Sequence, residues 1–341
     1  MNGFIKMLFT AGPMAIFLLS GTAAAQTDSI LVAGAHLTLL FDGGFFLEGP
    51  AVSQDGRIFF SDITFTSESG MQAGYIWQYD PGKGKATVYR SPSGMANGII
   101  FDRQGRMLVA EGADYGGRAI TRTDIETGKS TILAGLYQGK PLNSPNDLVL
   151  DCAGRLYFTD PRYTGHEPVE QPLEGIYRLD TDGTLKRLAG GFGKPNGIVI
   201  SPDQHTLYVS SFDDVSLEAY QAGKSRDPGV QGIIAFDLAA DGSLSNRRIL
   251  VNLAPEGGAD GLTIDTEGRI YAAVPGPQPG IFVYSPEGKQ LCVIQMRVPP
   301  SNVTFGRGAA VRFLYITAGT NLYEFEVMTT GFHPDPDCPD K

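Results

Sequence analysis

The chain has 341 residues, of which 42% are hydrophobic and 19% charged, with 44 glycines, 22 prolines and a formal net charge of −10. This composition is typical of one globular protein built from many short strands. The negative charge argues against nucleic acid or an anionic membrane surface as a partner, because phosphate binding needs a basic patch.

The N-terminus has the pattern of an export signal. Lys6 precedes an apolar segment over residues 7–19, and the small residues from Thr22 to Ala25 follow as a cleavage site. The apolar segment is too short for a comfortable transmembrane span. We expect residues 1–25 to be a signal peptide and the mature protein to be periplasmic or secreted, with no membrane association after cleavage. An uncleaved anchor is the alternative.

A polar residue just before an apolar run recurs along the chain, at intervals of 49, 49, 50, 64 and 42 residues. The six residues are Glu48, Asn97, Asn146, Asn196, Asp260 and Asn302. Each is followed by a turn, a second strand such as IFFSD and a third such as YIWQYD. Self-similarity at a period of about fifty residues, with several short strands per unit, indicates a β-propeller. We predict an all-β fold, a six-bladed β-propeller over residues 26–330, with a tail over 331–341.

A further strand, over residues 36–41, precedes the first repeat, and the last repeat has no obvious fourth strand of its own. A propeller closes its ring when one terminus completes the blade at the other end, which removes an open sheet edge. We therefore expect the N-terminal strand to complete the sixth blade.

The connections between second and third strands vary in length, whereas the first-to-second turns are short. The variable connections are residues 64–73, 112–117, 161–174, 212–231 and 275–279. Because consecutive strands of a blade alternate in direction, these connections are expected on the face where the six polar residues lie. Function on a rigid scaffold concentrates where loops vary, so we expect this elaborated face to carry the site.

The six polar residues begin the innermost strands, so their side chains are expected to converge at one mouth of the central channel. Glu48 and Asp260 bring two negative charges, and Asn146 and Asn196 bring neutral amide oxygens. Such a hard-oxygen set suits a divalent cation, Ca²⁺ best, with Mg²⁺ or Mn²⁺ possible and Zn²⁺ unusual without His or Cys. The alternative is a hydrated channel whose polar side chains only hold water.

Three cysteines allow at most one intramolecular disulfide. Cys152 lies in a predicted turn, Cys292 in an outer strand and Cys338 in the Pro- and Asp-rich tail. A bridge between Cys292 and Cys338 would pin the tail, and the alternative is that these two stay unpaired.

Four segments together resemble the gluconolactonase/regucalcin (senescence marker protein) family over essentially the whole predicted mature chain. They are Glu48-Gly49-Pro50, Ser144-Pro145-Asn146-Asp147, Pro195-Asn196-Gly197 and Asp260-Gly261. The resemblance implies a lactonase-type propeller in which Glu48, Asn146, Asn196 and Asp260 hold a catalytic divalent metal. Diisopropyl fluorophosphatase is a more distant relative with a similar ring.

One position departs from the regucalcin pattern. Regucalcin-like sugar lactonases have an arginine two residues before the third-blade asparagine, where it contacts substrate, whereas this chain has Ser144. The metal chemistry therefore transfers to this chain better than the identity of the substrate.

A carboxylate beside such a cation can act as general base, and Asp260 is favoured for this role, with Asp147 second. Adjacent strand residues point to opposite sides, so whether Asp147 reaches the channel beside Asn146 stays open. The candidates for substrate binding are Asn97, Asn146, Arg162 and Tyr163. Arg162 and Tyr163 lie with His166 on the elaborated third-blade connection, where an ordinary loop residue is the alternative for each.

The sequence therefore predicts a divalent-metal-dependent hydrolase that acts on a small lactone, with a sugar aldonolactone such as gluconolactone favoured. The alternatives are a phosphotriester or other organophosphate hydrolase on the same metal site, and a non-catalytic ligand-binding propeller with a structural ion. No G-x-S-x-G motif supports a serine hydrolase triad. The expected partner is a small molecule, and the oligomeric state is left open.

Overall fold

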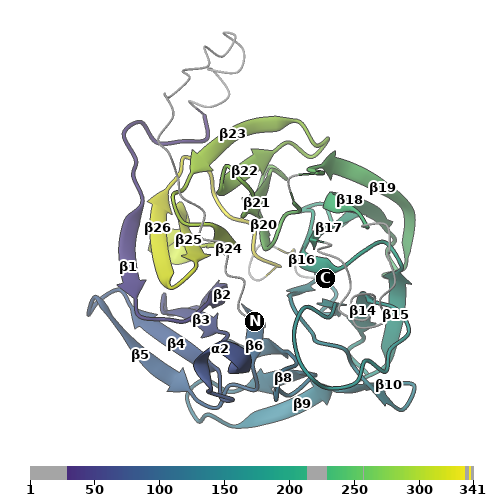
Figure 1. Cartoon of the computed structure of the whole chain (residues 1–341). Coiled ribbons are helices and arrows are strands. Elements are labelled where there is room, and N and C mark those ends of the chain that lie inside the picture. The colour runs from purple at the N-terminus through teal and green to yellow at the C-terminus, as the bar shows by residue number, and fades with distance from the viewer. Residues whose placement is uncertain (1–28, 213–228, 256, 335–337, 339–341) are drawn as a thin grey trace, which may run out of the picture.

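A computed structural model of the chain describes residues 29–212, 229–255, 257–334 and 338. Six four-stranded sheets surround a central channel, which confirms the predicted six-bladed β-propeller (Figure 1). The predicted signal peptide over residues 1–25 lies outside the described residues, as do parts of the fourth-blade connection and of the tail.

Each blade is an antiparallel sheet whose strands follow one another outward from the channel. The first three blades contain β2 (Leu47–Val52), β3 (Ile58–Asp62), β4 (Tyr75–Asp80) and β5 (Lys85–Arg90); β6 (Ala96–Phe101), β7 (Met107–Glu111), β8 (Ala119–Thr123) and β9 (Ser130–Ala134); and β12 (Leu148–Leu150), β13 (Leu156–Asp160), β14 (Gly175–Leu179) and β15 (Leu185–Gly190). The short hairpin β10 (Leu136–Tyr137) and β11 (Lys140–Pro141) joins the second blade to the third.

The fourth and fifth blades contain β16 (Pro195–Ile200), β17 (Thr206–Phe212), β18 (Gln231–Leu238) and β19 (Leu244–Asn252); and β20 (Leu262–Ile264), β21 (Ile270–Val274), β22 (Gly280–Tyr284) and β23 (Gln290–Gln295). The sixth blade contains β24 (Pro300–Phe305), β25 (Phe313–Ala318), β26 (Asn321–Glu326) and β1 (Thr38–Asp42).

The ring closes as the sequence predicts. β1 pairs antiparallel with β26, with Thr38 opposite Glu324 and Asp42 opposite Asn321, and Figure 1 shows the two strands side by side. The N-terminal strand thus supplies the outer edge of the last blade, so that the first and last segments of the domain hold each other in place.

The hydrophobic core lies between blades rather than in one central cluster. The second strands β3, β7, β13 and β21 are buried at every residue, because both faces of each sheet are covered by a neighbouring sheet. Aromatic contacts join adjacent blades, such as Phe59 with Phe101 at 5.4 Å and Tyr271 with Phe305 at 5.0 Å between ring centroids. The core contacts therefore connect each of these blades to its neighbour around the ring.

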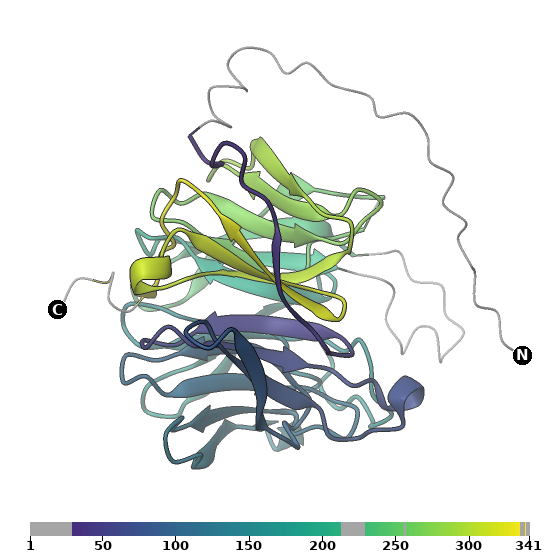
Figure 2. The ribbon, with the colours of Figure 1, turned by 90° about the vertical axis from the view of Figure 1, so that its left-hand side faces the viewer.

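The two faces of the disc differ as expected. The short helix α2 (Thr66–Ser69) lies in the connection from β3 to β4, and the 3₁₀ turn η1 (Gly308–Ala310) lies in the connection from β24 to β25. Figure 2 shows them on opposite faces. The second-to-third connections that the structure describes share the face of α2, the elaborated face, and the first-to-second turns share the plain face of η1.

The predicted bridge between Cys292 and Cys338 is wrong. Cys338 is bonded to Cys152, with Cα atoms 5.5 Å apart, and Cys292 is a buried free thiol. Cys292 faces the core between blades five and six, whereas Cys152 lies in the plain-face turn between β12 and β13. The disulfide therefore attaches the tail to the third blade.

The tail runs along the plain face before it reaches this disulfide. The backbone N–H of Phe332 donates to Ile264 O at 3.0 Å, and His333 Nε2 lies 3.0 Å from Gly306 O. A cavity of about 560 Å³ occupies the plain-face half of the channel, with Asp147 and Asn302 among its lining residues together with Phe332 and His333. Within the described residues, no helix has the length and apolar character that crossing a membrane requires.

The disulfide gives the first prediction. Cys152→Ser should lower the free energy of unfolding by about 2–4 kcal/mol, because the bond closes a long loop in the unfolded chain. Thermal and urea unfolding with and without reductant measure this loss.

A thiol count under denaturing, non-reducing conditions should give one free thiol for the wild type and none for Cys292→Ala. Three free thiols in the oxidised wild-type protein would contradict the Cys152–Cys338 pairing.

Candidate functional site

The six polar residues gather where the innermost strands begin. Four of them lie in the first residues of β2, β6, β16 and β24, and two lie just before β12 and β20. In the order of the chain they are Glu48, Asn97, Asn146, Asn196, Asp260 and Asn302. We call this set the polar ring. It stands at the elaborated-face mouth of the channel, as the sequence predicts.

Glycines bring neighbouring inner strands unusually close at the polar ring. A Cβ at Gly49, which has φ +44°, would lie 2.0 Å from the carbonyl oxygen of Asn97, and a Cβ at Gly261 would lie 2.0 Å from the Asn302 side chain. The residue after the ring position must therefore be small at these two places. The Asp-Gly and Glu-Gly pairs here serve close approach of strands rather than a hairpin turn.

Buried hydroxyls on the second strands fix the backbone of the polar ring. Ser61 Oγ donates to Asn97 O at 2.7 Å, Thr159 Oγ1 to Asn196 O at 2.7 Å and Ser210 Oγ to Asp260 O at 2.5 Å. Each bond links one blade to the ring residue of the next. These hydroxyls were missed by the sequence analysis, although a small polar residue near the end of an otherwise apolar second strand was a visible signal.

Asp147 faces the channel, which answers the question that strand alternation left open. Its Oδ1 accepts a hydrogen bond from Leu148 N at 2.8 Å and lies 2.5 Å from where a Cβ of Gly98 would stand. Strict alternation does not apply here, because Asn146 N donates to Thr159 O at 2.9 Å while Thr159 N donates to Asp147 O at 3.0 Å, so that two residues oppose one residue of β13. The strand pairing of four other blades shifts register at the same place. Asp147 and Asn302 also line the cavity on the plain-face side.

Three carboxyl groups influence one another at this point of the channel. Burial raises the pKa of Glu48 to about 7; the Gly49 N–H partly offsets this, and the charge of Asp147 adds to it. Burial likewise raises the pKa of Asp147 to about 7. The pKa of Asp260 is raised well above its usual range, by burial first and then by the charges of Glu48 and Asp147. The site therefore disfavours negative charge unless a cation is added.

The polar ring fits a divalent cation. Among the described residues, no positively charged side chain contributes to the pKa values of Glu48, Asp147 or Asp260. In addition, the Oδ1 of Asn97 is buried and has no hydrogen-bond partner among the residues that the structure places. A buried carboxylate and a buried amide oxygen without a hydrogen bond both lower the stability of the fold, unless a cation or a hydrogen-bond donor binds to them.

A metal at the polar ring would need both carboxylate and amide oxygens as ligands. Over the placed part of the chain, no group of three or more His, Cys, Asp and Glu side chains gathers as a metal cluster. Amide oxygens would therefore have to supply part of the coordination, which suits hard cations such as Ca²⁺ better than Zn²⁺.

Tyr163 contacts the polar ring through the side chain of Asn196. Asn196 Nδ2 donates to Tyr163 Oη at 3.2 Å, and this hydroxyl donates to Phe212 O at 3.2 Å. The ammonium of Lys194, a fully buried side chain, lies 4.8 Å from the centroid of the Tyr163 ring. Tyr163 therefore holds the amide of Asn196 in a fixed orientation.

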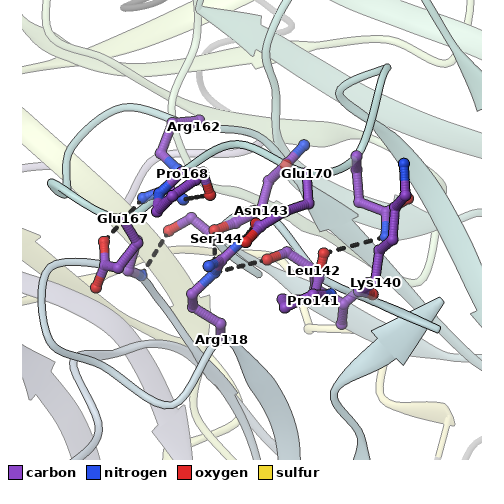
Figure 3. Close-up of polar contacts among 12 residues, drawn as sticks. Arg118, Lys140, Pro141, Leu142, Asn143, Ser144, Arg162, Glu167, Pro168 and Glu170 are labelled. Atoms are coloured by element: carbon purple, nitrogen blue, oxygen red, sulfur yellow. Dashed lines mark hydrogen bonds and ion pairs between the residues drawn. The ribbon is translucent and has the colours of Figure 1, made fainter.

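The side chain of Arg162 forms its contacts within its own connection, between β13 and β14. This side chain is only 2% exposed, and its Nη1 contacts Glu167 Oε2 at 3.0 Å (Figure 3). The same Nη1 donates to Thr164 O at 3.2 Å. Nη2 donates to Pro168 O at 3.3 Å. The guanidinium thus organises residues 162–168, and the described contacts do not join it to the polar ring.

Comparison with known proteins identifies the family to which the chain belongs. Residues 46–320 match the family model described as "SMP-30/Gluconolactonase/LRE-like region". A gluconolactonase from Zymomonas mobilis is 30% identical over 334 residues, covering 90% of this chain and 85% of its own length.

Solved structures show the same fold. The gluconolactonase XC5397 from Xanthomonas campestris has a TM-score of 0.73 and 30% identity, with 89% of this chain and 92% of that chain covered. A calcium-binding regucalcin from Agrobacterium tumefaciens has a TM-score of 0.66 at 19% identity, covering 86% of this chain and 95% of that chain, and shows likeness of fold. The chain belongs to the SMP-30/gluconolactonase/LRE-like family.

Proposed function

We propose that this protein hydrolyses small lactones at the polar ring, that sugar aldonolactones are its substrate class, and that a divalent cation, Ca²⁺ in the first place, is required. The observation that carries the proposal is the group of carboxylates at Glu48, Asp147 and Asp260, whose pKa values no positively charged side chain of the described residues lowers. In the same polar ring, the buried Oδ1 of Asn97 has no hydrogen-bond partner within the described part of the chain. The similarity to a protein named gluconolactonase supports the choice of lactones.

Glu48, Asn146, Asn196 and Asp260 are the residues that would hold the ion. When bound, a cation of this kind polarises the carbonyl of an ester and makes a coordinated water more acidic. Asn196 Nδ2 donates a hydrogen bond to the Tyr163 hydroxyl at 3.2 Å, so this amide nitrogen already has a partner. The amide oxygen of Asn196 is thereby left for the ion.

Hydrolysis of a lactone adds water across one ester bond and yields a hydroxy acid, which loses one proton at neutral pH. Asp260 is the general base that we assign. Asp260 keeps more exposed surface than Glu48, so its carboxylate is the more accessible of the two to a water molecule at the channel mouth. Asp147, unlike Asp260, is among the residues that line the plain-face cavity.

The amide side chains bind the substrate in this account. Asn97 is only partly buried as a residue, while its Oδ1 has no partner, so it can accept a hydrogen bond from a sugar hydroxyl. Asn146 is buried beside it, since Gly98 N donates to Asn146 O at 2.7 Å. A site built to pair hydroxyl groups discriminates against substrates that lack them.

We also propose that the protein works in the periplasm or outside the cell, after loss of residues 1–25. The Cys152–Cys338 disulfide supports this location, because structural disulfides persist in oxidising compartments.

Removal and return of the metal test the proposed function. Metal-stripped protein should hydrolyse D-glucono-1,5-lactone no faster than the spontaneous reaction, and Ca²⁺ should restore turnover, because the carboxylates alone cannot stabilise the developing oxyanion. Proton release measured by pH-stat, with the spontaneous rate subtracted, gives the answer.

A wild-type protein that is equally active with and without chelator would contradict the metal requirement. If Ca²⁺ stabilises the protein against heat but only phosphotriesters are hydrolysed, the proposed lactone substrates are wrong and the proposed ion stands.

Asp260→Asn should lower kcat by roughly a hundredfold or more, because it removes the proton acceptor and one charge of the ligand set. The matched control is Asp182→Asn, an exposed turn residue, which should leave kcat unchanged. Steady-state kinetics at saturating Ca²⁺ measure both variants. Wild-type kcat in Asp260→Asn would eliminate Asp260 as the base.

A further inference from the structure

Two aromatic rings lie against each other at a tilt on the elaborated face, and neither belongs to the polar ring. Tyr115 and His166 have ring centroids 3.9 Å apart, with an angle of 35° between the planes. Tyr115 is 52% exposed and the His166 side chain 51% exposed. Tyr115 comes from the connection between β7 and β8, and His166 from the connection between β13 and β14. Because half of each side chain faces solvent, burial in the core does not explain the pair.

The backbone that carries Tyr115 is held in a strained conformation. Asp114, Tyr115 and Arg118 all have positive φ angles, of 68°, 67° and 48°. Left-handed backbone costs about 1 kcal/mol or more for a residue with a side chain. Three such residues within one short connection persist only when surrounding contacts impose them, and strain of this kind concentrates at functional sites.

Contacts from two other blades impose this conformation. The Glu167 carboxylate accepts hydrogen bonds from Asp114 N at 3.1 Å and Tyr115 N at 2.7 Å, and the ion pair with Arg162 holds it there (Figure 3). On the other side, Thr66 N donates to Asp114 Oδ2 at 2.9 Å. The Tyr115 ring is therefore presented by a fixed support rather than by a loose loop.

Arg118 adds a second support on the same connection. Its Nε donates to Leu142 O at 2.7 Å, and its Nη2 contacts Glu170 Oε2 at 2.6 Å (Figure 3). The connections of the second and third blades are thus joined at both ends of the aromatic pair.

The same connection lies over the segments that lead into the polar ring. Gly112 N donates to Met95 O at 2.9 Å, two residues before Asn97. Ala113 N donates to Ser144 Oγ at 2.9 Å, two residues before Asn146. The aromatic pair therefore stands at the rim of the channel mouth, on the side of the second and third blades.

We infer that Tyr115 and His166 form a stacking ledge that binds the ring of a sugar lactone and sets the preference for it. This inference rests on the proposed function. A pyranose-type lactone carries its hydroxyls around the ring edge and C–H groups on its faces, so an exposed aromatic surface can bind a face while nearby amides bind the edge. Rigid support lowers the entropy cost of such binding.

The test is binding of D-glucono-δ-lactam, a ring analogue that the protein cannot hydrolyse as an ester, to the calcium-loaded protein by titration calorimetry. Tyr115→Ala should weaken binding roughly tenfold, in keeping with alanine substitutions of stacking aromatics. His166→Ala should weaken it less, and Tyr115→Phe, which keeps the ring, should recover most of the loss. Ile132→Ala, at an exposed apolar residue of β9, is the matched control.

Two further readouts separate a ledge from a structural role. In Tyr115→Ala the KM for D-glucono-1,5-lactone should rise by a similar factor while kcat stays within about twofold, and the thermal stabilisation by Ca²⁺ should not change. Unchanged lactam affinity in Tyr115→Ala, or a loss of Ca²⁺ stabilisation in parallel with lactam affinity, would overturn the ledge.

Failure of the proposed function gives a different pattern. A wild-type protein that does not hydrolyse the lactone but binds the lactam through Tyr115 would contradict lactone hydrolysis and support the ledge. A wild-type protein that neither hydrolyses the lactone nor binds the lactam would overturn both.

Discussion

The mutual repulsion of buried carboxylates is the constraint on which the rest of the molecule depends. The charge of Asp147 raises the pKa of Glu48, and the charges of Glu48 and Asp147 raise the pKa of Asp260. Like charges in a poorly solvated channel oppose folding. Each carboxylate comes from a different blade, so only the closed ring brings them together. A bound cation would remove the repulsion and stabilise the six-bladed disc at the same point.

The architecture can be understood as support for that point. Close approach at Gly49 and Gly261 narrows the channel mouth, and the hydroxyls of Ser61, Thr159 and Ser210 fix the ring backbone from the neighbouring blade. β1 closes the circle on β26, and the tail is attached to the third blade by Cys152. The elaborated connections are then free to shape the approach to the site, as the fixed Tyr115–His166 pair illustrates.

Much of this was readable from the sequence because the repeat is long and regular. The six ring positions, the closure by the N-terminal strand and the difference between the two faces all follow from repeat spacing and strand alternation. The orientation of Asp147 did not follow, since it depends on register shifts that no residue pattern announces. The predicted bridge between Cys292 and Cys338 was wrong for a related reason. Cys292 faces the interior, and tertiary contacts decide the path of the tail past Phe332.

The central claim is that the polar ring holds one divalent cation. Anomalous diffraction from crystals grown with Ca²⁺ tests it most directly. The account predicts one anomalous peak at the elaborated-face mouth, about 2.3–2.6 Å from oxygens of Glu48, Asn146, Asn196 and Asp260. A channel mouth that shows only water at saturating Ca²⁺ would contradict it.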